Sequence, residues 1–212
     1  MIQNIPIYLI YLPNRKQRWE PTLKNLNDNK VYPILYQGID GIDWKLKTDL
    51  SENKYSKKFT SGRLGCFLSH FMLWNHLSHV DKSESIIILE DDVRIDTDFK
   101  SRFDEVFKQL PSNWDFVYLG CEWIPFNPDD KYSENLLIGK PFCTHAYMIN
   151  KKTIPILMNS CSLLETYLDI QIMEKVLPKV NHYVVDPVLV KQQSLTDMND
   201  YKSLCKDWKT FL

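Results

Sequence analysis

Three consecutive acidic residues, Glu90, Asp91 and Asp92, follow an apolar run near the middle of the chain. The run, residues 86–89, is aliphatic without polar alternation, as in a strand covered on both faces. At roughly 3.3 Å per residue the carboxylates lie within about 10 Å, with Glu90 and Asp92 on one side of an extended chain and Asp91 on the other. Burying them is costly unless a cation shares the site. The triplet therefore predicts a Mg²⁺ or Mn²⁺ site near phosphate, with a solvated acidic turn as the alternative.

A basic cluster follows the first predicted strand, residues 5–12. Arg15, Lys16 and Arg18 stand at the start of the next segment. Arginine guanidinium groups match the geometry of phosphate oxygens. The cluster therefore predicts a contact with a pyrophosphate, and a solvated helix start is the alternative.

Two histidines and one isolated aspartate are candidates for proton transfer. His70 follows Ser69 in an almost wholly apolar helix, where a hydrogen-bonded core residue is the commoner outcome. No partner acid is apparent nearby, so the pair does not indicate a hydrolase triad. His145 interrupts an otherwise apolar strand. Asp169 has apolar neighbours and is either a general base with a raised pKa or a residue on a helix surface.

Strand and helix patterns alternate along the chain. Strands are expected at residues 5–12, 32–37, 86–89, 115–119, 142–149 and 182–190, and helices at 15–29, 64–80, 99–110, 151–161 and 165–177. A long polar loop is expected at 42–60. This alternation predicts an α/β domain with a largely parallel sheet. Ligands of such sheets bind outside the carboxyl ends of the strands, where the acidic triplet and the basic cluster both stand.

The composition indicates one soluble domain and excludes several classes of protein. The chain has 212 residues, 44% of them hydrophobic, and a net charge of −1. That charge balance argues against a nucleic-acid partner. The cysteines are scattered without a CxxC pair, which indicates reduced thiols rather than a zinc knuckle or a disulfide framework; they are Cys66, Cys121, Cys143, Cys161 and Cys205.

The two ends of the sequence bear on localisation. The N-terminus has no basic n-region, and no run approaches the ~20 apolar residues of a membrane span, so a cytoplasmic protein is expected. Residues 199–212 carry aromatic and leucine residues at helical spacing between lysines. We expect this tail to be a helix that packs on the domain or lies on a membrane surface.

Several motifs together resemble glycosyltransferase family 25, which includes lipopolysaccharide and collagen galactosyltransferases. In chain order they are LPNRKQR, GIDG, GRLGCFLSHFMLWNHL, IILEDDV, WDFVYLG, THAYMINKKTI, LD and QQSLTDM. The segment GxxGCxxSH followed by LEDDV is the most specific part. The resemblance implies a single GT-A, Rossmann-like nucleotide-diphosphosugar transferase domain over residues 1–198.

The resemblance also implies roles for individual residues. Asp92 would be the main ligand of Mn²⁺ or Mg²⁺, and Glu90 would lie near the metal or the ribose. Asp169 is the candidate base, with His145 and His70 as weaker candidates. The residues expected to bind the nucleotide sugar are Leu12, Asn14, Arg15, Arg18, Asp40, Glu90 and Asp91.

The activity that the resemblance implies is inverting transfer of a hexose from a UDP-sugar, galactose or else glucose. The acceptor would be a hydroxyl of a glycan, of a lipid-linked saccharide, or of a hydroxylysine-type protein site. The main rival is a GT-A protein that binds sugar nucleotide or glycan without turnover. A metal-dependent phosphohydrolase is a second rival, but the sequence shows no second cluster of metal ligands.

Overall fold

A seven-stranded sheet forms the centre of the protein. The computed structural model describes residues 2–43, 60–80, 82–122 and 130–193. The strands lie in the order β2-β1-β3-β7-β5-β8-β6. Their bounds are β1 Ile7–Tyr11, β2 Ile34–Gln37, β3 Ser85–Glu90, β5 Phe116–Glu122, β6 Leu136–Leu137, β7 Phe142–Asn150 and β8 His182–Val185.

Most strands of this sheet run in the same direction. Strand β1 is parallel to β2 and β3, and β5 is parallel to β8. Strand β7 lies between β3 and β5 and is antiparallel to both, so β5 runs with β3. Only β7 and the edge strand β6 are reversed among the seven. The predicted α/β class with a largely parallel sheet is confirmed.

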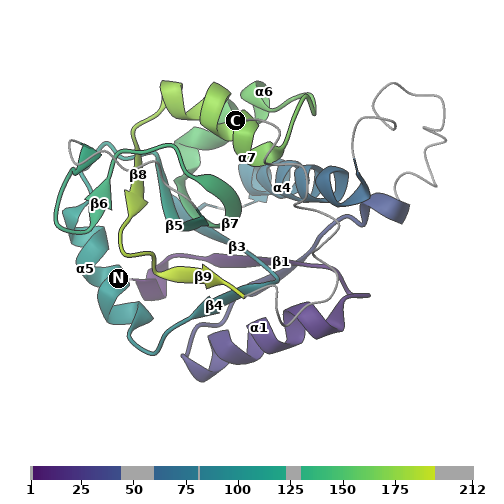
Figure 1. The fold of residues 1–212 in the computed structure, drawn as a ribbon, viewed down its shortest axis with the longest axis horizontal. Helices are drawn as coiled ribbons and strands as arrows, with labels where there is room; N and C mark the ends of the chain where they lie inside the picture. Colours follow the sequence, from purple (N-terminus) through teal and green to yellow (C-terminus); the bar gives the residue numbers. More distant parts are fainter. Residues whose placement is uncertain (1, 44–59, 81, 123–129, 194–212) are drawn as a thin grey trace.

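Helices cover both faces of the sheet (Figure 1). Ile86 and Ile88 of β3 face a core shared with α4 (Ser61–Val80), α6 (Ile154–Ser160) and α7 (Leu168–Gln171). Ile87 and Leu89 face the opposite core, shared with α1 (Lys16–Asp28) and α5 (Phe99–Gln109). All four side chains are at most 1% exposed. The apolar run before the acidic triplet is therefore a strand buried on both faces, as predicted.

The predicted last strand, residues 182–190, is wrong. The chain instead forms β8 and the separate strand β9 (Val190–Gln192), which pairs antiparallel with β4 (Val93–Ile95). Pro187 lies between β8 and β9 and has no N–H to donate to a ladder. Because β4 directly follows the acidic triplet, this small sheet brings the end of the described chain to the triplet.

The predicted helices at 151–161 and 165–177 are only partly regular. The first is a 3-10 turn, Lys151–Thr153, followed by α6. The second is the short α7, a π-helical turn over Ile172–Val176 and a 3-10 turn over Leu177–Lys179. A further 3-10 turn, Ile2–Asn4, precedes β1. Most of the predicted loop 42–60 and the whole predicted tail 199–212 lie outside the described residues. Among the described helices none is both long and apolar enough to cross a bilayer.

The loop after β2 packs tightly on the start of α4. A Cβ atom on Gly65 would lie 2.8 Å from the carbonyl oxygen of Ile39 and 3.1 Å from the backbone nitrogen of Gly41. A Cβ on Gly41 would lie 1.9 Å from the carbonyl oxygen of Ser61. Both glycines are therefore needed for the close approach that fixes this loop at the edge of the sheet.

We expect Gly65→Ala to lower the free energy of unfolding by at least about 1 kcal/mol, because the new methyl group forces backbone atoms apart. Gly62→Ala is the matched control, since Gly62 is exposed in the same helix. A glycine-to-alanine change at an exposed helical site usually stabilises, by up to about 1 kcal/mol. Urea unfolding of both variants measures the difference, and a shift of the same sign in both would contradict the close approach.

Candidate active site

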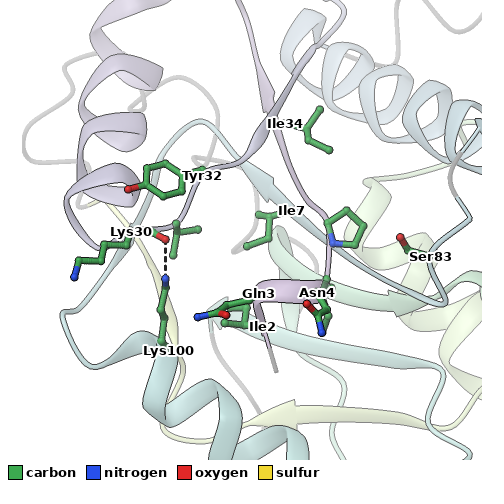
Figure 2. A pocket seen from close by; sticks show the side chains of 12 residues that line it. Ile2, Gln3, Asn4, Ile7, Lys30, Tyr32, Ile34, Ser83 and Lys100 are labelled. Atoms are coloured by element: carbon green, nitrogen blue, oxygen red, sulfur yellow. Dashed lines mark hydrogen bonds between the residues drawn. The ribbon is translucent and has the colours of Figure 1, made fainter.

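A hollow of about 660 Å³ lies at the amino-terminal ends of β1, β2 and β3 (Figure 2). Apolar side chains such as Ile2, Ile7 and Tyr32 line most of it. Lys100 Nζ donates a hydrogen bond to the carbonyl oxygen of Lys30 at its rim, 2.7 Å away. No carboxylate or histidine is among its lining residues. Candidate chemistry therefore concentrates at the other edge, where the triplet stands.

The carboxyl edge of the sheet collects polar residues from both helical layers. The parallel strands β1, β2 and β3 all end there, and the reversed strand β7 begins there. Glu90 ends β3, and residues 91–92 form a turn into β4. The predicted meeting of the first-strand loop with the triplet at this edge is therefore observed.

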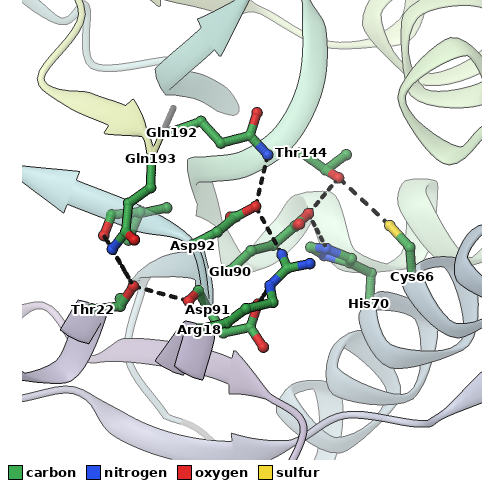
Figure 3. Close-up of polar contacts among 11 residues, drawn as sticks. Arg18, Thr22, Cys66, His70, Glu90, Asp91, Asp92, Thr144, Gln192 and Gln193 are labelled. Atoms are coloured by element: carbon green, nitrogen blue, oxygen red, sulfur yellow. Dashed lines mark hydrogen bonds and ion pairs between the residues drawn. The ribbon is translucent and has the colours of Figure 1, made fainter. Parts of the chain in front are cut away.

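Arg18 of α1 forms ion pairs with two of the three acids (Figure 3). Its Nε lies 3.0 Å from Asp91 Oδ1, and its Nη2 lies 2.8 Å from Asp92 Oδ2. The Asp92 side chain is only 1% exposed, and that of Asp91 is 10% exposed. The positive charge that the buried triplet requires thus comes, in this structure, from a guanidinium group in a forked geometry.

Other groups fix the turn that carries the two aspartates. The backbone N–H of Leu12 hydrogen-bonds to Asp91, and the Thr22 hydroxyl donates to the Asp91 carbonyl oxygen at 2.9 Å. The Gln192 side-chain amide donates to Asp92 Oδ2 at 2.8 Å, and the backbone N–H of Gln193 donates to the Asp92 carbonyl oxygen at 2.7 Å. The residue after β1, strand β9 and helix α1 therefore all hold this turn in place, and Figure 3 shows the contacts of Thr22 and Gln192.

The two aspartates are hard to ionise despite Arg18. Burial raises the pKa of Asp91 to about 6 against the lowering effect of Arg18, and the negative charges of Asp92 and Glu90 add to the increase. Burial also raises the pKa of Asp92, and the Glu90 charge raises it further. The turn therefore concentrates negative charge beyond what one guanidinium group compensates.

Glu90 has the opposite character. Its Oε1 lies 3.1 Å from His70 Nε2 and accepts a hydrogen bond from Thr144 Oγ1 at 2.7 Å (Figure 3). Burial acts to raise the pKa of Glu90, but the hydrogen bonds from His70 and Thr144 outweigh this effect and lower the pKa below its usual range. Glu90 is therefore a firmly ionised carboxylate.

The sequence predicted that Glu90 and Asp92 face one side of the chain and Asp91 the other, and this prediction is wrong. Asp91 and Asp92 share Arg18 on the α1 side, whereas Glu90 faces His70 on the α4 side. The physical reason is that only Glu90 is in the strand, while residues 91–92 have left the extended conformation. A period of two holds only for extended backbone.

Cys66, His70 and Glu90 place potential ligand atoms within 4.8 Å of one another. The Cys66 thiol is protonated, because burial raises its pKa well above the usual range and the Glu90 charge adds to this. Both nitrogens of His70 are already engaged, Nδ1 with the Tyr147 hydroxyl at 2.8 Å and Nε2 with Glu90. The chemistry of this donor set therefore fits a hydrogen-bond network rather than a metal site.

Asp92 and His145 have atoms that are better suited to bind a metal cation than Cys66 and His70 are. Asp92 Oδ1 and both ring nitrogens of His145 are buried and have no hydrogen-bond partner among the described residues. His145 is 2% exposed, and its charge would lower the pKa values of Asp92 and Glu90, which places it beside the triplet. A buried carboxylate oxygen without a partner is costly. Such an atom is a suitable ligand for a hard divalent cation.

Asp169 lies at the start of α7, close to this edge. Its Oδ2 accepts a hydrogen bond from the backbone N–H of Cys143 at 3.1 Å, and Cys143 has a φ of 78°. Burial raises the pKa of Asp169, and the Glu90 charge also raises it. The apolar surroundings read from the sequence thus have the predicted effect on its pKa, and the role of Asp169 as a base stays a prediction.

The loops after β1 and β2 also meet at the carboxyl edge. Asn14 Nδ2 donates to Asp40 Oδ2 at 2.9 Å, and this hydrogen bond is the main cause that lowers the pKa of Asp40, with a smaller contribution from the charge of Arg15. Three residues expected to bind a nucleotide are thus neighbours, while Arg18 has joined the acidic triplet instead.

A sequence model described as "Glycosyltransferase family 25 (LPS biosynthesis protein)" matches residues 4–172. The chain belongs to glycosyltransferase family 25. The matched range includes the acidic triplet, Arg18, His70, His145 and Asp169, so the site described above lies within the family domain. The resemblance read from the motifs is confirmed.

Curated relatives of this family 25 chain include transferases and proteins named as inactive. Procollagen galactosyltransferase 1 of Danio rerio is 29% identical over 128 residues, which cover 54% of this chain and 21% of that protein. Inactive glycosyltransferase 25 family member 3 of Homo sapiens is 26% identical over 156 residues, covering 66% of this chain and 25% of that protein. The chain thus spans about a quarter or less of these relatives' length.

Solved structures share the fold of the family 25 domain. A glycosyltransferase involved in glycosylation of the major capsid of PBCV-1 aligns with a TM-score of 0.56 at 15% identity, covering 91% of this chain and 96% of that one. The glycosyltransferase GlyE of Streptococcus pneumoniae TIGR4 aligns with a TM-score of 0.50 at 11% identity, covering 90% of this chain and 54% of that one. The predicted GT-A fold is confirmed.

Four further residues hydrogen-bond to the acidic triplet or to His70 and are not among the site residues predicted from the sequence. Thr144 and Tyr147 stand in the THAY motif, Gln192 in the QQ motif, and Thr22 in no motif. A polar residue within an apolar strand was the available signal for Thr144 and Tyr147. Only the pairing of β9 with β4 reveals that Gln192 reaches Asp92.

We expect Arg18→Ala to lower the free energy of unfolding by about 3 kcal/mol, because two buried carboxylates lose their counter-charge. Lys191→Ala is the control, since it removes the ion pair between Lys191 and Asp96 beside the small sheet. The Lys191 side chain is 57% exposed and that of Asp96 46%. Exposed pairs contribute about 0–1 kcal/mol. Guanidinium unfolding measures both, and equal small losses would show that Arg18 does not stabilise the triplet.

Proposed function

We propose that this family 25 chain transfers a hexose from a UDP-sugar to a hydroxyl group, with inversion at the anomeric carbon and with a divalent cation. The supporting observation is a shared pattern in Glu90 and Asp92. In each, one carboxylate oxygen accepts two hydrogen bonds, from His70 and Thr144 or from Arg18 and Gln192. Among the described residues the other oxygen, Glu90 Oε2 or Asp92 Oδ1, has none.

These two oxygens are the proposed metal ligands, with Asp92 as the main one. Carboxylates suit Mn²⁺ or Mg²⁺, which complete their coordination with phosphate oxygens and water. When bound, such a cation would stabilise the negative charge that develops on the β-phosphate as UDP leaves. Arg18 lies beside Asp92 and supplies a second positive charge at that position. Leu12, Asn14, Arg15, Asp40 and Asp91 surround the proposed nucleotide site.

Asp169 is the proposed general base. Inversion requires the acceptor hydroxyl to attack from the face opposite UDP, and a carboxylate within hydrogen-bond reach takes its proton. The raised pKa of Asp169 makes its carboxylate a stronger base than an exposed aspartate. His145 is the second candidate, because its ring nitrogens have no partner among the described residues.

Donor, acceptor and location are proposed from the resemblance and the relatives. A relative named as a procollagen galactosyltransferase supports galactose as the sugar, with glucose as the alternative. We propose a glycan, a lipid-linked saccharide or a protein hydroxyl as acceptor, and a cytoplasmic location with membrane contact through residues 199–212. We propose no nucleic-acid partner, because a net charge of −1 lacks the excess of basic residues that nucleic-acid binding requires.

A second candidate function is binding of a sugar nucleotide or glycan without turnover. Arg18 pairs with two of the acids, so part of their counter-charge comes from the protein itself without a metal. Curated relatives named as inactive belong to the same family. Turnover and binding therefore have to be measured separately.

We expect the chain to release UDP from UDP-galactose faster than from UDP-glucose with Mn²⁺, and EDTA to abolish release. Asp92→Asn should lower the rate by about 100-fold or more, because the proposed main ligand loses its charge. Asp96→Asn is the control, since Asp96 is a nearby exposed carboxylate that pairs with Lys191. A UDP-release assay with titrated Mn²⁺ measures all of these.

Two results would contradict the proposal in different ways. Release that persists in EDTA would rule out the metal but keep the transferase. No release from either sugar, together with UDP binding by calorimetry, would support the binding function when a panel of hydroxyl acceptors also gives no transfer.

We expect Asp169→Asn to lower transfer to an acceptor by about 100- to 10,000-fold while UDP affinity stays within about threefold, because only proton transfer is lost. Glu165→Gln is the control, since Glu165 is an exposed acid in the same segment that pairs with Lys175. Steady-state rates and UDP calorimetry measure the two effects. Wild-type turnover of Asp169→Asn would remove Asp169 from the role of base and leave His145.

A further inference from the structure

A row of buried hydrogen bonds lies behind Glu90, on the α4 side of the sheet. Trp74 Nε1 donates to the Tyr147 hydroxyl oxygen at 2.9 Å. That hydroxyl lies 2.8 Å from His70 Nδ1, and His70 Nε2 lies 3.1 Å from Glu90 Oε1. Trp74, Tyr147 and His70 are each at most 1% exposed. Because water does not reach them, these groups must satisfy one another's hydrogen bonds.

The direction of each hydrogen bond in this row follows from the donor inventory. An indole nitrogen only donates, so the Tyr147 oxygen accepts from Trp74. The one hydrogen of the Tyr147 hydroxyl then points to His70 Nδ1, its other partner among the described residues. His70 Nδ1 is therefore the acceptor, and Nε2 carries the proton and donates it to Glu90. A proton on Nδ1 would leave the Tyr147 hydroxyl hydrogen buried without an acceptor, which is costly.

This tautomer has a consequence for Glu90. Its Oε1 receives two donors, His70 Nε2–H and the Thr144 hydroxyl, from helix α4 and from strand β7 of the sheet that α4 covers. The carboxylate is held by one oxygen, and Oε2 receives no hydrogen bond from the described residues. Figure 3 shows Glu90 with His70 and Thr144 on one side, and with Arg18 and its partners Asp91 and Asp92 on the other.

We propose that the Tyr147 hydroxyl, oriented by Trp74, and the Glu90 carboxylate together fix His70 as the Nε2–H tautomer, and that His70 is a positioning residue that holds Glu90 toward the donor rather than a proton acceptor. The tautomer assignment stands on the hydrogen bonds alone. The positioning role rests on the proposed function, in which Glu90 Oε2 contacts the metal or the ribose. Since neither ring nitrogen is available to an incoming hydroxyl, His70 is excluded as the base under this proposal.

Nitrogen-15 NMR of the histidine rings in the 212-residue chain, without substrate, tests the tautomer. The chain has five histidines, and the His70 signals are assigned by their loss in His70→Gln. We expect a pyrrole-type Nε2 and a pyridine-type Nδ1. In Tyr147→Phe the Nδ1 acceptor loses its donor while Nε2 still donates to Glu90, so we expect the Nδ1 signal to move to that of a pyridine-type nitrogen without a hydrogen bond and Nε2 to stay pyrrole-type. An imidazolium or an Nδ1–H ring in the wild type would overturn the assignment.

Tyr118→Phe is the matched control for Tyr147→Phe. Tyr118 lies opposite Tyr147 in the sheet, is equally buried, and packs against the same ring of Phe116. Its hydroxyl has no hydrogen-bond partner among the described residues. We expect Tyr118→Phe to leave the His70 shifts unchanged. Equal shifts in both variants would show a packing effect, and unchanged shifts in both would show that the Tyr147 hydroxyl does not donate to His70 Nδ1; either result overturns the proposal.

Two His70 variants test the positioning role. Gln offers an amide N–H near the position of Nε2 but cannot accept a proton, whereas Phe keeps the ring shape without a donor. We expect His70→Phe to weaken binding of UDP with Mn²⁺, measured by calorimetry, by about 10- to 100-fold, because a hydrogen bond to a charged group is lost. We expect His70→Gln to restore affinity to within about fivefold of the wild type. Thermal unfolding verifies that each variant is folded.

The NMR measurement and the His70 variants together distinguish failure of this proposal from failure of the proposed function. A His70→Gln variant that binds UDP normally but is as inactive as His70→Phe would make His70 a proton acceptor and overturn the positioning role. UDP affinity unchanged in both variants would overturn it as well. A wild-type chain without transferase activity would fail the proposed function alone, because the NMR and calorimetry readouts need no turnover.

Discussion

The burial of three negative charges at the end of β3 is the constraint on which this structure depends. Asp91 and Asp92 are almost fully buried and would be strongly destabilising without Arg18. Glu90 is held on the other side by His70 and Thr144. Arg18 belongs to α1 and His70 to α4, and these two helices cover opposite faces of the sheet. Compensation of the triplet therefore links both helical layers to the same strand end.

The two sides of the triplet differ in their chemistry. On the α1 side, burial dominates and raises the pKa values of Asp91, to about 6, and of Asp92. On the α4 side, hydrogen bonds outweigh burial and lower the pKa of Glu90. Glu90 is thus ionised, and an additional positive charge would stabilise the ionised forms of Asp91 and Asp92. This asymmetry is consistent with a site that receives a cation together with an anionic ligand.

The reversed strand β7 explains how so many groups reach one edge. Because β7 runs antiparallel to β3 and β5, its first residues, not its last, lie at their carboxyl ends. Thr144 and His145 are consequently beside the triplet, and Tyr147, further along the same strand, reaches His70. The left-handed backbone at Cys143, hydrogen-bonded to Asp169, also belongs to this start of β7. An all-parallel sheet would place these residues elsewhere.

The sequence by itself determined the α/β class, the two-sided burial of β3, the family and the place of the acidic triplet at a strand end. These follow from local patterns, since hydrophobic period and adjacency are written along the chain. Only the tertiary structure decided that Arg18 pairs with the aspartates, that Gln192 reaches Asp92, and that residues 182–190 divide between two sheets. Those outcomes depend on contacts between residues up to 100 positions apart. No local pattern encodes which distant side chain neutralises a buried charge.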